Sequence, residues 1–103
     1  MNREEATRHA LATGLKELPE NGEYIHYGFY SDVFCALIVK RTPKRIEAFG
    51  IQTYFNGDEK YYFLSNEKMT FTLRKDGTWK KVGYKDMWSR LSNEPYTYWD
   101  PNF

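Results

Sequence analysis

Apolar and polar residues alternate with a period of two along most of the chain between Tyr24 and Val82. This alternation is typical of β-strands that bury one face, and short polar turns separate the runs. One run, Val33–Val39, is apolar throughout and predicts a central strand buried on both faces. We expect a twisted antiparallel sheet of five to six strands in meander order. The expected strands span residues 23–30, 33–39, 45–55, 60–65, 69–74 and 78–82.

A helical pattern precedes these strands, in residues 2–18. Asn2 is a favourable N-cap, and Glu5 follows three residues later, as in a capping box. Spacings of four and three residues would place three leucines on one apolar stripe. These leucines are Leu11, Leu15 and Leu18. Because this stripe is narrow, we expect the helix to pack on the sheet, which gives an α+β fold in a single domain spanning residues 1–103.

The C-terminal part of the chain predicts a second, short helix followed by an irregular tail. The helix would span residues 84–91 and carry Met87, Trp88 and Leu91 on one side. Prolines then interrupt any regular pattern in the tail. The tail nevertheless carries four aromatic residues: Tyr96, Tyr98, Trp99 and Phe103.

The dipeptide Asn56-Gly57 predicts a hairpin and fixes which residues share a face of the sheet. A two-residue loop pairs Ile51 with Tyr62, and a four-residue loop leaves the faces unchanged. One face then holds Phe49, Ile51, Tyr62 and Leu64, and the other holds Gln52, Tyr54, Tyr61 and Phe63. Either the aromatic tail folds across this second face, or the face remains an exposed patch of the kind that marks partner sites.

The stretch around Asp76-Gly77 predicts a further hairpin with two alternative loops. A two-residue loop pairs Arg74 with Trp79, whereas a three-residue loop pairs Leu73 with Trp79. The second loop places Trp79 on the core face. Burial of a large apolar side chain is worth about 3 kcal/mol, which exceeds the cost of choosing one loop over another, so we favour the second loop.

Composition and charge indicate which classes of protein the chain can belong to. The chain of 103 residues is 41% hydrophobic and 18% aromatic, with a formal net charge of +1. This profile is typical of a folded globular domain, and the small charge gives no general attraction to nucleic acid. A single cysteine, Cys35, excludes an internal disulfide, and no apolar run resembles a signal peptide or membrane span. We expect a cytoplasmic protein that does not bind membranes.

The candidate chemical groups do not form a catalytic or metal-binding pattern. His26 lies in an expected strand without a carboxylate that would orient it as a general base. Cys35 lies in an apolar run, where a thiol acts as a small hydrophobic group and not as a nucleophile. No spacing of cysteine and histidine suits zinc, and no glycine-rich phosphate loop is present. We expect a protein that is not an enzyme and uses no metal or cofactor.

The favoured hypothesis is a small binding or regulatory protein that acts on a protein partner, including a second copy of itself as a homodimer. Its contacts would come from the aromatic sheet face or the C-terminal tail. The candidate partner-binding residues are Tyr54, Tyr61, Phe63, Tyr98 and Trp99.

Two alternatives remain open. Basic clusters in segments 40–45 and 74–85 would suit a nucleic-acid-binding protein, since cations bind phosphates and sheet aromatics stack on bases. The basic candidates are Lys40, Arg41, Lys44, Arg45, Arg74, Lys80 and Lys81. A third hypothesis is a small-molecule binder with a pocket between helix and sheet, where His26 and either Tyr24 or Tyr30 would supply polar groups.

Overall fold

The computed structural model describes residues 2–84 and 86–99 of the chain. It contains one helix and a seven-stranded antiparallel sheet, so the predicted α+β class is confirmed and the sheet is larger than predicted. The elements are α1 (Arg3–Ala12), β1 (Lys16–Glu17), β2 (Tyr24–Gly28), β3 (Phe34–Thr42), β4 (Arg45–Asn56), β5 (Glu59–Leu73), β6 (Trp79–Lys81) and β7 (Trp88–Ser92).

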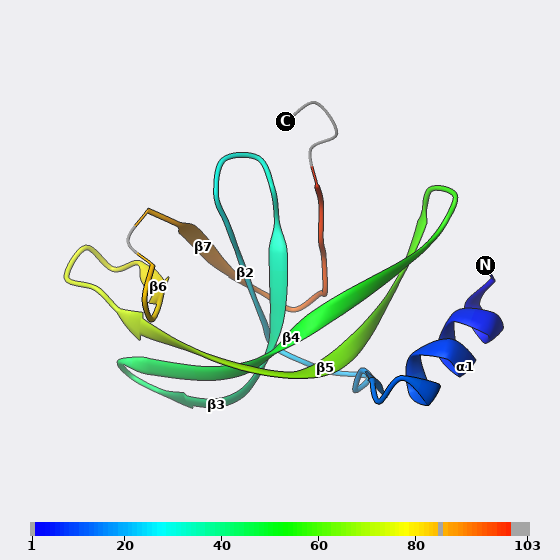
Figure 1. Ribbon diagram of the computed structural model, residues 1–103. Coiled ribbons are helices and arrows are strands. Elements are labelled where there is room, and N and C mark those ends of the chain that lie inside the picture. The colour runs from blue at the N-terminus through cyan, green and yellow to red at the C-terminus, as the bar shows by residue number, and fades with distance from the viewer. Residues whose placement is uncertain (1, 85, 100–103) are drawn as a thin grey trace.

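The strands from β2 to β6 follow one another as a meander, as the short turns predict. The 15-residue strand β5 is shared by two parts of the sheet: it pairs with β1 near Leu64 and with β6 near Phe71. At the far edge, β7 pairs with β2. The sheet is strongly bent. As a result, β6 approaches β7, although β6 pairs with β5 and β7 pairs with β2 (Figure 1).

We call the bent part of the sheet the half-barrel; it consists of β2, β3, β6, β7 and the adjoining halves of β4 and β5. The hydroxyl of Ser89 donates to the carbonyl of Trp79 at 2.6 Å and links β7 to β6. The half-barrel encloses the largest hydrophobic cluster, in which Ile25, Ile46 and Phe71 are completely buried. Large side chains from five strands therefore converge on one core.

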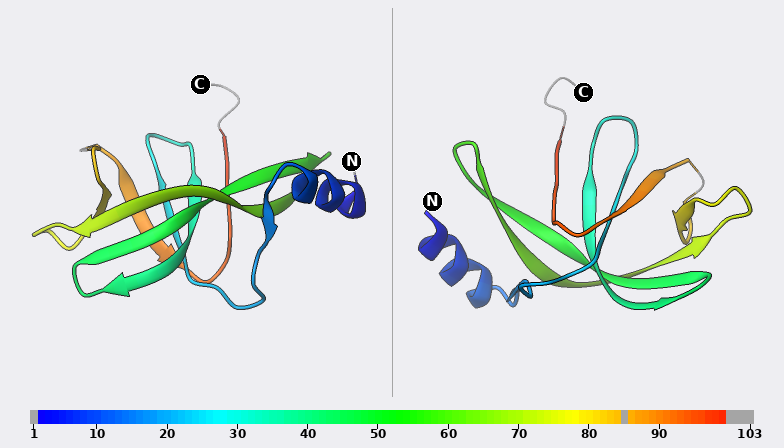
Figure 2. Two further views of the ribbon diagram at one scale, coloured as in Figure 1. Left: turned by 60° about the horizontal axis from the view of Figure 1, so that its bottom comes forward. Right: turned by 180° about the vertical axis from the view of Figure 1, so that it is seen from behind.

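The other end of the sheet is covered by α1, which lies beside the β4–β5 hairpin and away from β6 and β7 (Figure 2). Ala6 and Ala10 are completely buried against Tyr61 and Phe63. The predicted N-cap is confirmed, because the Asn2 side chain accepts a hydrogen bond of 2.8 Å from the Glu5 amide.

The predicted extent of the helix, residues 2–18, is wrong at its C-terminal end. The helix ends at Ala12 because Gly14 adopts a left-handed conformation with φ of 91°. The amide of Gly14 donates to Leu11, and that of Leu15 donates to Ala10, which is a Schellman ending. The predicted stripe of three leucines does not form, and Leu11 is 51% exposed.

The second predicted helix, residues 84–91, is also wrong. Strand β7 occupies this region and pairs Leu91 with Ile25 and Trp88 with Gly28. All five residues of β2 are buried, so this strand needs a hydrogen-bonding partner on each side. The pairing that β7 supplies outweighs the weak helical pattern of the segment.

The two hairpin predictions have different outcomes. Leu73 pairs with Trp79, which confirms the three-residue loop with a left-handed Gly77, and Trp79 packs against the core with part of its surface exposed. In the other hairpin, Ile51 pairs with Leu64 and not with Tyr62. The predicted faces are correct, because the register differs by two residues.

Candidate binding surface at the mouth of the half-barrel

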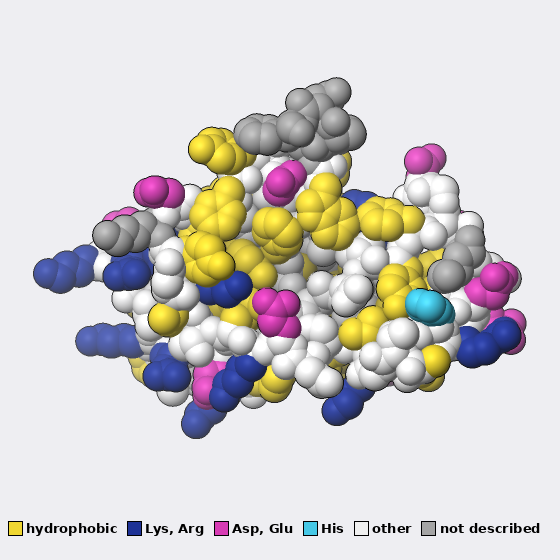
Figure 3. All heavy atoms as spheres, viewed as in Figure 1, with side chains coloured by type: hydrophobic (Ala, Val, Ile, Leu, Met, Phe, Trp, Pro, Cys, Tyr) yellow, Lys and Arg dark blue, Asp and Glu magenta, His cyan; other side chains and the backbone are white. Residues whose placement is uncertain are grey.

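A trough lined by aromatic side chains opens at the mouth of the half-barrel. It consists of two hollows of about 300 and about 460 Å³ that share Glu67. We call it the aromatic trough. The first hollow is lined by Tyr27, Phe29, Phe34, Glu67, Lys81, Tyr84 and Met87, and the second by Ile51, Gln52, Thr53, Ser65, Glu67 and Trp99. Hydrophobic side chains gather on this surface above β5, with charged groups among them (Figure 3).

The aromatic rings of the trough contact one another in pairs. The ring centroids of Phe29 and Tyr84 are 5.7 Å apart. Trp99 bridges the walls, since its ring lies 6.5 Å from that of Phe34 and 5.7 Å from that of Phe55. Tyr84, Trp99 and Phe55 are nevertheless 45%, 43% and 49% exposed. Rings that are fixed by neighbours but still exposed can bury apolar area on a partner at a small cost in side-chain entropy.

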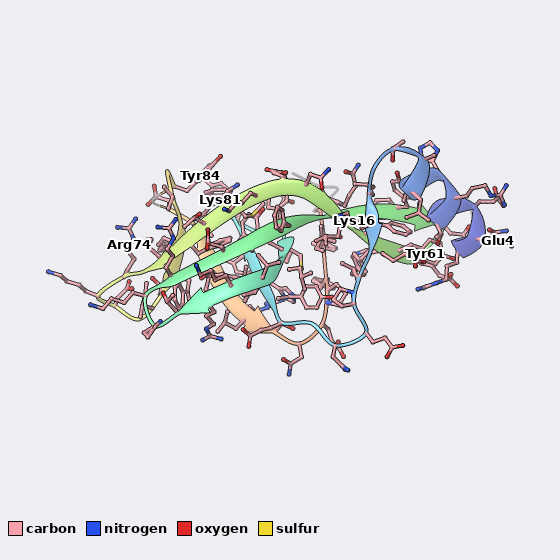
Figure 4. The ribbon with its side chains drawn as sticks, turned by 90° about the horizontal axis from the view of Figure 1, so that it is seen from below. Glu4, Lys16, Tyr61, Arg74, Lys81 and Tyr84 are labelled. Atoms are coloured by element: carbon pink, nitrogen blue, oxygen red, sulfur yellow. The ribbon has the colours of Figure 1, made fainter. Side chains whose placement is uncertain are left out.

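Two opposite charges line this trough. The Lys81 ammonium lies 5.0 Å from the centroid of the Tyr84 ring and 5.5 Å from that of Tyr27, within the range of cation–π attraction. Figure 4 shows Lys81 and Tyr84 close together, at the end of the molecule opposite Glu4. In residues 2–84 and 86–99, neither Glu67 nor Lys81 takes part in an ion pair with another residue of that part of the chain. The trough can therefore offer both charges to a ligand.

Burial and the nearby Glu67 carboxylate keep the Tyr27 hydroxyl neutral. Burial raises the pKa of Tyr27 to about 12, and the negative charge of Glu67 contributes in the same direction. This phenol is thus a neutral hydrogen-bonding group at any physiological pH.

The structure separates the predicted partner-binding residues into two groups. Tyr61 and Phe63 are buried beneath α1, and the ring of Tyr54 packs between them and His9, with centroids 5.4 Å from Phe63 and 5.5 Å from His9. The sequence analysis expected either the tail to cover this face or the face to remain exposed; neither alternative is correct, because α1 covers it.

The tail lies on the opposite face of β4 and β5. The hydroxyls of Thr97 and Thr53 are 2.7 Å apart, and Tyr98 forms a β-bridge with Val33. Tyr98 and Trp99 remain partly exposed, with Trp99 in the aromatic trough. The fourth tail aromatic, Phe103, lies outside the described residues.

The sequence analysis missed most residues of the trough. The alternation in residues 23–30 already places Tyr27 and Phe29 on one face, and this signal was available. Tyr84 follows β6, where its amide donates to the Lys81 carbonyl at 3.1 Å, and its ring contact with Phe29 joins distant segments, which no local pattern indicates.

The predicted basic residues lie together at the half-barrel end. The Leu73 amide donates to the Lys44 carbonyl at 3.0 Å, and Thr72 is paired with both Arg45 and Lys80, so the two basic segments flank the same end of β5. Lys80 and Lys81 point to opposite faces of β6 because they are consecutive in a strand. Arg41 forms an ion pair of 2.9 Å with Glu23.

The structure does not bring the predicted small-molecule residues into one pocket. His26 is buried, and its Nδ1 accepts from the Arg90 Nε at 3.2 Å, so its Nε2 carries the proton that is donated to the Glu94 carbonyl at 2.8 Å. Tyr30 is 82% exposed. A hollow of about 500 Å³ between α1 and β5 is lined in part by Tyr24, but His26 and Tyr30 do not line it.

The remaining chemical groups are inert or absent from the described part of the chain. Burial raises the pKa of the Cys35 thiol to about 11, which disfavours the reactive thiolate. In the part of the chain that the structure describes, no cluster of three acidic, histidine or cysteine side chains could hold a metal ion. Helix α1 is too short to cross a bilayer, and no other helix occurs in the described residues.

No family model, curated protein or solved structure matches the chain.

Proposed function

We propose that the protein is a small non-enzymatic binding or regulatory protein that holds an extended segment of a protein partner in the aromatic trough. The observation that carries this proposal is that the partly exposed rings of Tyr84 and Trp99 line the two hollows, with the partly exposed Phe55 ring against Trp99. Aromatic residues dominate the energy of protein interfaces when they enter or form pockets. Contiguous exposed apolar patches mark interaction sites, whereas singly exposed rings do not.

The chemistry of the trough specifies what the partner segment should contain. An apolar or aromatic side chain would fill the hollow between Tyr27, Phe34 and Tyr84. An acidic group beside it would reach the Lys81 ammonium, and a basic group on the other side would reach Glu67. Charges of this kind determine orientation and specificity more than affinity.

A selection experiment with a displayed random-peptide library tests the proposal. We expect enriched peptides that carry an apolar anchor between an acidic and a basic residue. The variants Tyr84→Ala and Trp99→Ala should each weaken binding of a selected peptide by about 30-fold, the effect of losing about 2 kcal/mol at an interface anchor.

The matched control is Leu11→Ala, which removes a 51% exposed apolar side chain from α1, outside the trough. This variant should bind the selected peptide as the parent does. Equal binding by the parent, Tyr84→Ala and Trp99→Ala would overturn the proposal. Self-association that Trp99→Ala abolishes would identify the partner as a second copy of the chain.

A further inference from the structure

The outer face of the half-barrel carries a set of cations that the sheet register brings together. A cross-strand row joins Thr42, Arg45, Thr72 and Lys80, one residue from each of β3, β4, β5 and β6. A second row joins Lys40, Glu47 and Thr70, and Lys68 forms an ion pair of 3.1 Å with Glu47. We call these rows the cationic face.

This cationic face lies on the other side of the sheet from the half-barrel core and from the first hollow of the trough, which Tyr27 and Lys81 line. Arg45 and Lys80 alternate along their strands with the core residues Ile46 and Trp79. They are two strands apart, which corresponds to roughly 10 Å at the usual strand spacing. A ligand of the cationic face would therefore not compete directly for the trough.

Positive charge dominates this face and the two hairpin turns at its end. The turns add Lys44, Arg74 and Lys75. Within the described residues of these rows and turns, the carboxylates are Glu47 and Asp76, and Asp76 is already bonded to the Thr78 hydroxyl at 2.6 Å. Hydrogen bonding and charge from Lys68 lower the pKa of Glu47, and Lys40 and Arg45 add to this effect.

We propose that the cationic face binds the phosphate backbone of double-stranded nucleic acid without reading its sequence. A hollow of about 320 Å³ lies among Lys40, Thr42, Arg45 and Glu47, where a phosphate group can contact two cations and a hydroxyl. Lysine, arginine and threonine side chains are common donors to backbone phosphates.

The composition of the face favours a duplex over a single strand. Single-strand binding uses aromatic side chains as stacking platforms. The uncharged positions of the two paired rows are Thr42, Thr70 and Thr72, and the described residues of these rows include no aromatic. Hydroxyl groups can donate to phosphate oxygens but cannot stack on bases.

Fluorescence anisotropy with a labelled DNA duplex tests this proposal. For four phosphate contacts, affinity should fall about 100-fold between about 50 and 200 mM salt. The double variant Arg45→Gln with Lys80→Gln should reduce that loss to about 10-fold, because two contacts disappear.

Because the Lys80 ammonium also donates to the Met87 carbonyl, a second double variant, Lys40→Gln with Lys44→Gln, checks the result independently of this contact. The matched control is Arg8→Gln with Lys16→Gln, which removes the same charge from α1 and β1. The control should keep the parental salt dependence.

Three outcomes would overturn the proposal: equal weakening by the control and the two test variants, tighter binding of an oligothymidine single strand than of the duplex, or no duplex binding at about 50 mM salt. Binding to vesicles of anionic lipid with no binding to the duplex would also overturn it. Since the trough is not involved, these outcomes are separate from those of the peptide selection.

Discussion

The half-barrel and the helix-covered end of the sheet are stabilised in opposite ways. In the half-barrel, large side chains such as Ile25 and Phe71 come from distant segments and fill a shared core. At the other end, Ala6 and Ala10 allow α1 to approach the rings of Tyr61 and Phe63 closely. The first core is stabilised by large side chains that fill it, whereas the second requires small side chains at the helix–sheet contact. The two ends should therefore be sensitive to opposite kinds of substitution.

The largest expected effect comes from removing volume in the half-barrel. Phe71 is completely buried, so Phe71→Ala should lower the free energy of unfolding by about 3–5 kcal/mol through lost burial and the cavity left behind. Chemical denaturation followed by tryptophan fluorescence measures this change.

A matched control for this variant is Leu73→Ala on the same strand and face, where the side chain is 37% exposed. Leu73→Ala should lower the free energy of unfolding much less than Phe71→Ala does. Similar losses for the two variants would contradict the assignment of Phe71 to the centre of the core.

An intermediate effect is expected from adding volume beneath α1. Ala10→Leu places a larger side chain where Cβ already contacts the sheet, and overpacking of this kind costs about 1–3 kcal/mol. Hydrogen exchange of α1 amides should accelerate while that of β2 amides changes little. The control Ala12→Leu, at an exposed position of the same helix, should leave exchange unchanged; equal acceleration in both variants would refute the close helix–sheet contact.

The smallest expected effect is a loss of stability at acidic pH that arises from His26 in β2. Burial lowers the pKa of His26; the hydrogen bond to Glu94 opposes this shift, and the charge of Arg90 adds to it. The unfolded chain therefore binds a proton at His26 more readily than the folded chain does. The contribution of neutral His26 to the free energy of unfolding should be complete above a pH of about 6.5. It should decline as the pH falls towards the lower pKa that His26 has in the folded protein.

Denaturation curves measured across that pH range test this expectation. The variant His26→Gln should lose part of the pH dependence between about 7 and 5, whereas His9→Gln on the exposed surface of α1 should retain it. An unchanged pH dependence in His26→Gln would show that another group is responsible.

The sequence predicted those parts of the fold that depend on local patterns. The meander follows from alternation and turn residues, and the position of Trp79 follows from the burial of a large ring. Gly14 is also a local signal, because a glycine after a run of helix formers is a common helix ending, whereas the longer predicted helix rested on the leucine spacing. The helix boundary could have been predicted from the sequence.

The predictions that were wrong concern parts of the fold that depend on contacts between distant segments. Residues 84–91 are weakly patterned, and their strand conformation is determined by β2, about sixty residues earlier in the chain. The contact of Tyr84 with Phe29 also joins distant segments, so the site could not be assembled from local patterns. The cover over Tyr61 and Phe63 was equally non-local: the expected alternatives were the tail or no cover, and α1 supplies it.

The three-residue turn Lys75–Gly77 has a consequence for how this protein can evolve or be redesigned. Adding or deleting one residue there would rotate every following side chain of β6 to the other side of the sheet, moving Trp79 into water and exchanging the positions of the two lysines. The length of the turn should therefore be strictly maintained, together with Asp76, whose carboxylate accepts hydrogen bonds from the Thr78 amide and hydroxyl. An alignment gap at this point would indicate a homologue whose two surfaces have different charges.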